Sequence, residues 1–427
     1  IPGGANLHRV VMTDLDGESA KAFQPFGSDD SLYPEDLWAW LDKTSQDTGG
    51  NFIAIPHNSN ISKGAMFDTI TMRNEPIGAE YAEIRRRWEP VVEITQYKGD
   101  SETHQTLSPD DPFADFENYP YYIQRDWTEY KPQVGDFVRS ALIRGLQLEQ
   151  KIGVNPYQFG VIGSTDAHTG LAAAEENNFH GKFATDSMPS AKLEGWSDNA
   201  NSSFGWAMGA QGLAAVWAPE NTREAIFDAL ARRETYATTG PRVALRFHAV
   251  WGIDEAMIDD PGLVQHLGAT AVPMGAVFST SQQPQSPEFL VWAVRDPLDA
   301  PLQRIQMVKG WIDDAGQTHE NVVDIACADG LQVDPATGRC PDNGASVDLS
   351  TCQYSSGSGA TELKTRWRDP DYDQNQSAFY YVRVLMNPTC RWSSYDAIRL
   401  GREPDPSVPA TIQERAWSSP TWVGGQP

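Results

Sequence analysis

The sequence predicts an α/β fold over residues 1–242, followed by a mainly β, sandwich-like region over residues 243–427. Strand-like and helix-like segments alternate in the first part, which is typical of β/α order. Beyond residue 243 the apolar pattern changes to a period of two, with Pro, Gly and Asp in the turns. A chain of 427 residues also exceeds the size at which one hydrophobic core usually stops growing. We therefore expect two closely docked parts.

The first part is built from segments with recognisable helix and strand signals. A helix should begin near Ser31, which can act as the N-cap, with Pro34 in its first turn. The other segments are, in chain order, a strand at 52–56, a helix at 81–88, a strand at 91–94, a helix at 135–150, a strand at 159–162 and a helix capped by Asn221 that ends at Arg233.

The second part has strand patterns and no helical stretch of comparable strength. Its predicted strands are 243–247, 289–294, 305–308 and 379–385. Such a series favours a β sandwich-like region that packs against the first part and shapes one wall of the site.

A carboxylate and an imidazole, Asp166 and His168, stand two residues apart just after the apolar run 159–162. In extended backbone both would project to the same side. His57 ends another apolar run, and His8 leads into a third. Taken singly, the Asp can cap a turn and each His can be a surface residue. Their repetition at strand ends, however, indicates a metal site formed by all four, and mixed His/Asp ligation suits zinc, manganese or iron.

Several strings also resemble a known family. They are 6–9, 55–60, 98–104, 163–168, 232–242 and 392–401. Together they are similar to domain-of-unknown-function family 3604, which itself resembles the PHP (polymerase and histidinol phosphatase) superfamily of metal-dependent phosphoesterases. The resemblance implies a distorted β/α barrel that holds two or three divalent ions, with His8, His57, Asp166 and His168 as ligands. The His-x-His motif that opens such a core does not precede His8, so its first strands are expected to be missing or supplied by a separate fragment.

Polar residues in the loops after the strands are candidates for catalysis and substrate binding. Lys98 can pair with a phosphate oxygen, His104 can act as a general acid, and Glu93 stands at a strand end. The substrate-binding candidates are Arg9, Asn58 and Asn60. For each of these residues a solvated loop or an internal salt bridge is the plain alternative.

The combined prediction is a hydrolase that uses metal-activated water on a small-molecule ester. The phosphoester class comes from the resemblance alone, so carboxylic esters, lactones and sulfate esters remain open. Two further alternatives are a binding protein on a decayed enzyme scaffold and a structural role for a processed fragment. No Gly-x-Ser-x-Gly nucleophile elbow is present.

Charge and cysteine content restrict the partners and the compartment. A formal charge of −25 argues against binding to nucleic acid, and no apolar run approaches the ~20 residues of a membrane span. The cysteines at 327, 340, 352 and 390 lack zinc-site spacing and permit three disulfide pairings, of which Cys327–Cys340 with Cys352–Cys390 is favoured. Disulfides indicate an oxidising compartment, so a periplasmic or secreted location is expected.

Overall fold

The structure is a computed structural model that describes residues 5–123, 128–194, 205–252, 258–260, 262–268, 271–279 and 286–424. Its helices are α1 (Pro34–Thr48), α2 (Ala79–Trp88), α3 (Val138–Ile152), α4 (Pro189–Glu194), α5 (Arg223–Ala231), α6 (Leu263–Leu267) and α7 (Trp392–Arg399). Its strands are β1 (Arg9–Thr13), β2 (Phe52–Pro56), β3 (Val91–Gln96), β4 (Gly99–Asp100), β5 (Gly160–Gly163), β6 (Leu213–Val216), β7 (Thr235–Thr238), β8 (Ala244–Val250), β9 (Ala271–Pro273), β10 (Val277–Phe278), β11 (Glu288–Val294), β12 (Leu302–Ile312), β13 (Thr318–Cys327), β14 (Val347–Asp348), β15 (Gln353–Tyr354), β16 (Glu362–Arg368), β17 (Ala378–Met386), β18 (Thr389–Cys390), β19 (Thr411–Ile412), β20 (Arg415–Ser418) and β21 (Thr421–Val423).

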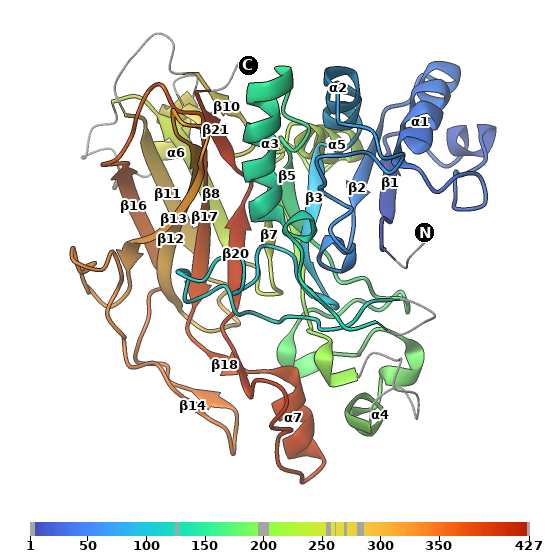
Figure 1. Ribbon diagram of the computed structural model, residues 1–427. Helices are drawn as coiled ribbons and strands as arrows, with labels where there is room; N and C mark the ends of the chain where they lie inside the picture. The colour runs from blue at the N-terminus through green and yellow to red at the C-terminus, as the bar shows by residue number, and fades with distance from the viewer. Residues whose placement is uncertain are drawn as a thin grey trace.

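In the first part of the chain, helices pack on short sheets. β1 pairs antiparallel with β2, while β3 pairs parallel with β5 and antiparallel with β4. The apolar face of α3, which includes Ala141 and Leu142, packs in one core cluster with Val92 of β3 and Val161 of β5. Figure 1 shows α1 and α2 beside β1 and β2 at the N-terminal end of the molecule, with α3 between these strands and the C-terminal sheets. α3 thereby covers β3 and β5.

The expected β/α barrel is wrong. Within the described residues the strands form open sheets and no closed barrel, and the only parallel pairs are β3–β5 and β10–β21. A β/α barrel requires successive parallel strands, but β7 pairs antiparallel with β6 on one side and with β20 on the other. β6 and β7 therefore join a large, mainly antiparallel sheet and do not close a ring.

The C-terminal sheets pack face to face. One is an eight-stranded sheet that contains β12, β13, β17 and β20, and the other has the order β16-β11-β8-β9. A single core cluster lies between them, in which Phe247 and Phe289 from the smaller sheet meet Tyr380 and Val382 from the larger one. The strand patterns predicted around 243–247, 289–294, 305–308 and 379–385 fall in β8, β11, β12 and β17. Alternating apolar residues thus supply both inner faces.

The large sheet draws strands from both sides of residue 242. β6 and β7 precede that position, whereas their neighbour β20 lies near the C-terminus. Residues far apart in the sequence therefore share hydrogen-bonded strands, and the division into domains at residue 242 stays a prediction.

A buried ion network also joins the early and late parts of the chain. The carboxylate of Glu102 accepts hydrogen bonds from Arg139 (2.6 Å) and Arg383 (3.0 Å). The carboxylate of Asp111 accepts from the same two guanidinium groups, at 2.9 and 2.7 Å. All four side chains are at most 1% exposed. We call these residues the Glu102 network.

Two helix caps differ from the sequence prediction. The N-cap of α1 is Tyr33, and the Ser31 hydroxyl instead donates to Asp36 at 2.5 Å. The N-cap of α5 is Thr222, whose side chain accepts from the backbone N–H of Ala225. Helix ends are thus shifted by one or two residues from the strongest cap signals in the sequence.

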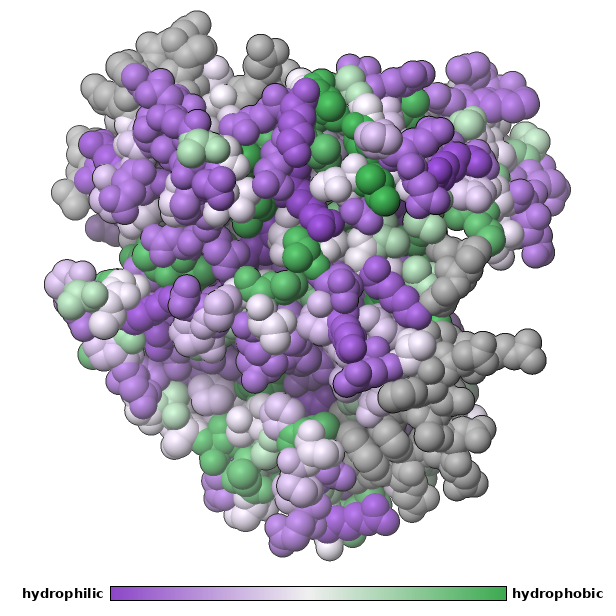
Figure 2. Space-filling model, in the orientation of Figure 1, coloured by the Kyte–Doolittle hydropathy of each residue, from purple (hydrophilic) through white to green (hydrophobic). Residues whose placement is uncertain are grey.

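The predicted disulfides are confirmed as Cys327–Cys340 and Cys352–Cys390, with sulfur–sulfur distances of 2.00 and 2.02 Å. No helix in the described ranges is long and apolar enough to cross a membrane. On the face drawn in Figure 2 hydrophilic residues predominate, and hydrophobic residues gather only in small patches. This surface agrees with the strongly negative composition of the chain.

Candidate active site

Several of the predicted site residues gather where three strands of the first part end. β2 ends at Pro56, directly before His57, β3 ends at Gln96, and β5 ends at Gly163. Beyond β5 the chain turns, because Asp166 has a φ of 59°, in the left-handed region that non-glycine residues rarely adopt. The sequence predicted extended backbone for Asp166 and His168, but both residues lie in a loop. Their side chains nevertheless meet.

Asp166 is the centre of this polar cluster. Its Oδ2 atom is contacted by the ammonium groups of Lys98 and Lys182, and Gln96 Nε2 donates to it at 3.2 Å. Its Oδ1 atom lies 3.1 Å from Nε2 of His168. The side chains of Lys98, Lys182 and Asp166 are 3%, 7% and 10% exposed, so water screens these charges weakly.

His57 faces the cluster with an orientation fixed by its neighbours. Its Nδ1 lies 2.9 and 3.0 Å from the carboxylate oxygens of Glu93, which can only accept when ionised. The neutral imidazole therefore carries its proton on Nδ1 and leaves Nε2 as an acceptor for Asn58 Nδ2, 2.7 Å away. The same Nε2 lies 3.8 Å from Asp166 Oδ1. Ser164 donates a further hydrogen bond to Glu93.

Burial and crowded charge shift the titration of the cluster. Burial, followed by the charge of Lys182, holds the pKa of Lys98 well below its ordinary value. Burial lowers the pKa of Lys182 to about 8 and also lowers that of His168. For Glu93, burial opposes ionisation, but the charge and hydrogen bond of His57 outweigh it and the pKa is lowered. Burial thus favours the neutral form of both amines, although each of them contacts the Asp166 carboxylate.

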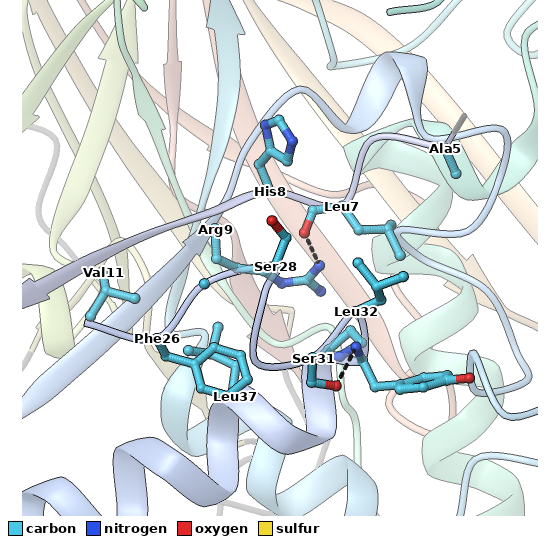
Figure 3. Close-up of a pocket in the computed structure, with 13 residues that line it drawn as sticks. Ala5, Leu7, His8, Arg9, Val11, Phe26, Ser28, Ser31, Leu32 and Leu37 are labelled. Atoms are coloured by element: carbon cyan, nitrogen blue, oxygen red, sulfur yellow. Dashed lines mark hydrogen bonds between the residues drawn. The ribbon is translucent and has the colours of Figure 1, made fainter. Parts of the chain in front are cut away.

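His8 lies beside this cluster. Its ring stacks near that of His57, with centroids 6.2 Å apart and planes inclined by 16°. Burial, then the charge of His57, lowers the pKa of His8. Figure 3 shows that the His8 ring points away from the Arg9 side chain at the edge of a cavity of 310 Å³. His8 is therefore placed next to His57.

Arg9 does not contact the cluster as a substrate-binding residue would. Its Nε forms an ion pair with Glu89 (2.8 Å), and its Nη1 donates to the carbonyl of Leu7 (2.7 Å), as Figure 3 shows for the latter. Arg85 holds the other oxygen of Glu89 at 3.0 Å. The sequence prediction for Arg9 is replaced by a buried structural ion pair, which was one of the plain alternatives.

Asn60 and His104 have supporting contacts. Asn60 Nδ2 donates to the backbone carbonyl of Lys98 at 2.8 Å and so fixes the segment that carries this lysine. His104 Nδ1 lies 2.8 Å from the Thr106 hydroxyl, and its ring packs against Phe137. Within the described part of the chain, no hydrogen bond or ion pair links His104 to Asp166. The catalytic role expected for His104 therefore has no support in this arrangement.

The donors of the cluster match a metal ion in kind. Ligands bound at about 2.0–2.2 Å to a tetrahedral ion lie roughly 3.3–3.5 Å from one another. The distances of 3.1 and 3.8 Å from Asp166 Oδ1 to His168 and His57 bracket that spacing. A carboxylate on the far nitrogen of a histidine, as Glu93 is for His57, is the usual support of a metal-bound imidazole. Among the described residues, however, no group of three or more His, Cys, Asp or Glu is arranged as a complete metal site.

Three members of the cluster were not predicted from the sequence. Lys182 comes from an irregular segment after β5, Gln96 from the end of β3 and Ser164 from the turn after β5. The only sequence signal for Gln96 and Ser164 was their position at strand ends. Lys182 lies in a stretch without periodicity, so nothing in the sequence placed it near Asp166.

The fold and the cluster define a mixed α/β, mostly β protein with a polar site of imidazole, carboxylate and ammonium groups at its strand ends. The chain belongs to the family described as Protein of unknown function (DUF3604), which it matches over residues 1–425. Comparisons with curated proteins and with solved structures give no match.

Proposed function

We propose that this chain is a metal-dependent hydrolase of small anionic esters, with phosphoesters as the favoured class, and that the Asp166 cluster is its active site. The proposal is supported by one arrangement above all. Two buried ammonium groups and two imidazoles surround a single carboxylate at the ends of neighbouring strands. The resemblance of the family to the PHP superfamily, expected from the sequence, is the ground for favouring the phosphoester class.

In this proposal His57, Asp166 and His168 hold a divalent ion, with His8 as the candidate ligand for a second. A bound ion of this kind lowers the pKa of a water ligand and stabilises charge on the attacked centre. Mixed nitrogen and oxygen ligation is compatible with zinc, manganese or iron. Glu93 keeps the His57 ring in one tautomer and one orientation through the 2.9 Å contact with Nδ1.

The lysines supply substrate binding in the same proposal. Lys98 and Lys182 present ammonium groups that can each donate to an oxygen of an anionic ester. The side chains of Asn58 and Gln96 are hydrogen-bonded to each other. Asn58 also contacts His57 and Gln96 contacts Asp166, so the pair restricts the orientation of both side chains. Because these groups are largely buried, their attraction for an anion is stronger than that of surface lysines.

The test is a substrate panel on the purified chain. A phosphate monoester, a carboxylic ester, a lactone and a sulfate ester of similar size are assayed with manganese, zinc or iron(II), and again with a chelator. Asp166→Asn and Lys182→Met should lower phosphoester turnover at least a hundredfold. Lys192→Met is the matched control, because Lys192 is also a buried lysine, but it pairs with Asp396. Equal turnover in all variants, or turnover unaffected by the chelator, would contradict the proposal.

A non-catalytic anion-binding protein is the second candidate. It is favoured by the absence, within the described ranges, of a complete group of three metal ligands and by the contacts of both lysines with Asp166. Equilibrium dialysis with manganese and zinc separates the two functions. Saturable metal binding that is lost in Asp166→Asn supports the hydrolase, whereas anion binding without metal uptake supports the second candidate.

The compartment remains part of the proposal. Two disulfides in a chain with no free cysteine are stable in an oxidising environment, which points to an extracellular protein. We propose a periplasmic or secreted location. Thiol labelling of the protein isolated from its native source, with and without reduction, should detect free thiols only after reduction.

A further inference from the structure

A second cavity lies at the opposite ends of the strands that carry the Asp166 cluster. Its volume is 650 Å³, and its lining includes Asn51 before β2, Pro90 before β3, Gln158 before β5 and Arg233 before β7. Further polar residues of the lining are Arg86 and Arg87 of α2, together with Ser45, Glu83 and Asp228. The cavity is therefore separated from the candidate active site by the length of the strands.

Gln158 holds two of the arginines of this cavity. Arg86 Nη1 donates to the Gln158 side-chain oxygen at 3.3 Å, and Arg233 Nη1 donates to the Gln158 backbone oxygen at 3.5 Å. Arg233 Nε donates to the carbonyl of Gly275 at 2.7 Å, and its guanidinium group lies over Trp422. These contacts fix both planar groups but use only part of their ten N–H donors, five on each side chain.

Neither guanidinium group has a carboxylate partner within ion-pair distance in the described part of the chain. Their sequence neighbours do: Arg87 pairs with Asp42 at 3.1 Å, and Arg232 pairs with Glu234 at 3.4 Å. Burial and the charge of Arg86 lower the pKa of Arg233 to about 10, as expected for a cation without a counter-ion. In a chain of net charge −25, two uncompensated arginines in one cavity need another explanation.

Local negative charge does not fully compensate the pair. The C-terminal ends of α2 and α5 lie near the cavity, and each helix end contributes roughly half an elementary charge. The acids Glu83 and Asp228 also line the cavity but are exposed and screened by solvent. The partly buried carboxylate of Glu149 interacts with the charge of Arg86 without forming an ion pair. The unused donors of Arg86 and Arg233 thus remain available to a ligand.

We propose that this cavity is a binding site for a phosphate dianion, held by Arg86 and Arg233 and positioned by Gln158. Planar guanidinium groups match phosphate oxygens in a bidentate manner, which favours this anion over a monovalent one. The phosphate can be free or can belong to a small phosphomonoester, because the chemistry of recognition is shared. The inference stands apart from the proposed hydrolase, since it uses none of the residues of the Asp166 cluster.

The test is isothermal titration of the full-length chain with two probes, inorganic phosphate and glycerol 3-phosphate. The background variant is Lys98→Met, which removes one anion-binding group of the Asp166 cluster. Phosphate binding should persist in this background and should weaken at least tenfold when Arg86→Gln is added. Arg232→Gln is the matched control, because its side chain lies outside the cavity and pairs with Glu234. Arg233→Gln serves as a second variant if a thermal melt shows that it folds.

The outcomes separate the two anion sites. Binding that survives Arg86→Gln unchanged, or that is absent from the wild-type chain, overturns the proposal. Binding that is lost in Lys98→Met alone also overturns it, and assigns phosphate to the Asp166 cluster with the proposed hydrolase intact. If Arg86→Gln lowers the affinity for glycerol 3-phosphate more than the affinity for inorganic phosphate, the ligand is a phosphomonoester. Equal losses of affinity for the two probes identify the free anion.

Discussion

The Glu102 network allows a sharp prediction about stability, through the substitution Glu102→Gln. The Glu102 carboxylate accepts four hydrogen bonds, and the four donors are Arg139, Tyr381, Arg383 and Trp417 at 2.6, 2.6, 3.0 and 2.7 Å. A glutamine has the same shape but only one accepting oxygen. In either orientation its NH2 group therefore faces a guanidinium N–H and loses that contact.

The expected cost follows from the lost charge. Hydrogen bonds to charged groups contribute about 1.5–3 kcal/mol each, and breaking a buried ion pair by removing one partner costs about 3–5 kcal/mol. Glu102 is 1% exposed, so neither Arg139 nor Arg383 can recover the loss from water. We expect Glu102→Gln to lower the free energy of unfolding by about 3–5 kcal/mol.

The assay is urea denaturation followed by tryptophan fluorescence and by circular dichroism, with matching transitions as the test of two-state behaviour. Glu320→Gln is the control, because Glu320 also faces Arg139, at 3.5 Å, but is 28% exposed. The control should cost under about 1 kcal/mol, as partly exposed pairs do. Equal losses in the two variants would refute the reasoning that burial makes the Glu102 contacts strong.

Three further predictions concern acid, a disulfide and a helix cap. Burial opposes ionisation of Glu102, but the charges of Arg383 and Arg139 outweigh it and lower the pKa of this carboxyl group to about 2 from 4.5. The stabilisation by the ionised group is therefore complete above about pH 4.5 and is lost as the pH falls toward 2. The acid-unfolding transition of the wild type should accordingly be steeper than that of Glu102→Gln. Replacing Cys352 and Cys390 by alanine removes a cross-link of 38 residues and should cost about 4 kcal/mol by the loop-entropy model, checked by denaturation with and without reductant. Thr222→Ala should cost about 1 kcal/mol in thermal unfolding, whereas Asn221→Ala should be neutral; the reverse order would restore the cap expected from the sequence.

The sequence predicted local features better than their assembly. Strand 52–56 coincides with β2, and the position of His57, Asp166 and His168 at strand ends brought their side chains together. The pairing of the later strands was not predictable in the same way. A short buried strand such as β7 has no pattern that distinguishes parallel from antiparallel pairing, and its partner β20 lies far along the chain.

The contacts at the site that the sequence did not predict have a similar cause. The ion pair between Arg9 and Glu89 spans 80 positions in the sequence, so no local pattern distinguished it from an anion contact at a strand end. Lys182 reaches Asp166 from a segment without helical or strand periodicity. By contrast, the two disulfides were favoured because only four cysteines were present and none had the spacing of a metal site.

The Glu102 network also has a consequence for biosynthesis. Its hydrogen bonds to Tyr381, Arg383 and Trp417 connect residues 242 to 315 positions apart, so Trp417 emerges from the ribosome long after Glu102. Until Trp417 has been synthesised, the Glu102 carboxylate lacks one of its hydrogen-bond donors. Contacts of such long sequence separation slow folding, so nascent chains of this protein should depend on chaperones until Trp417 has been synthesised.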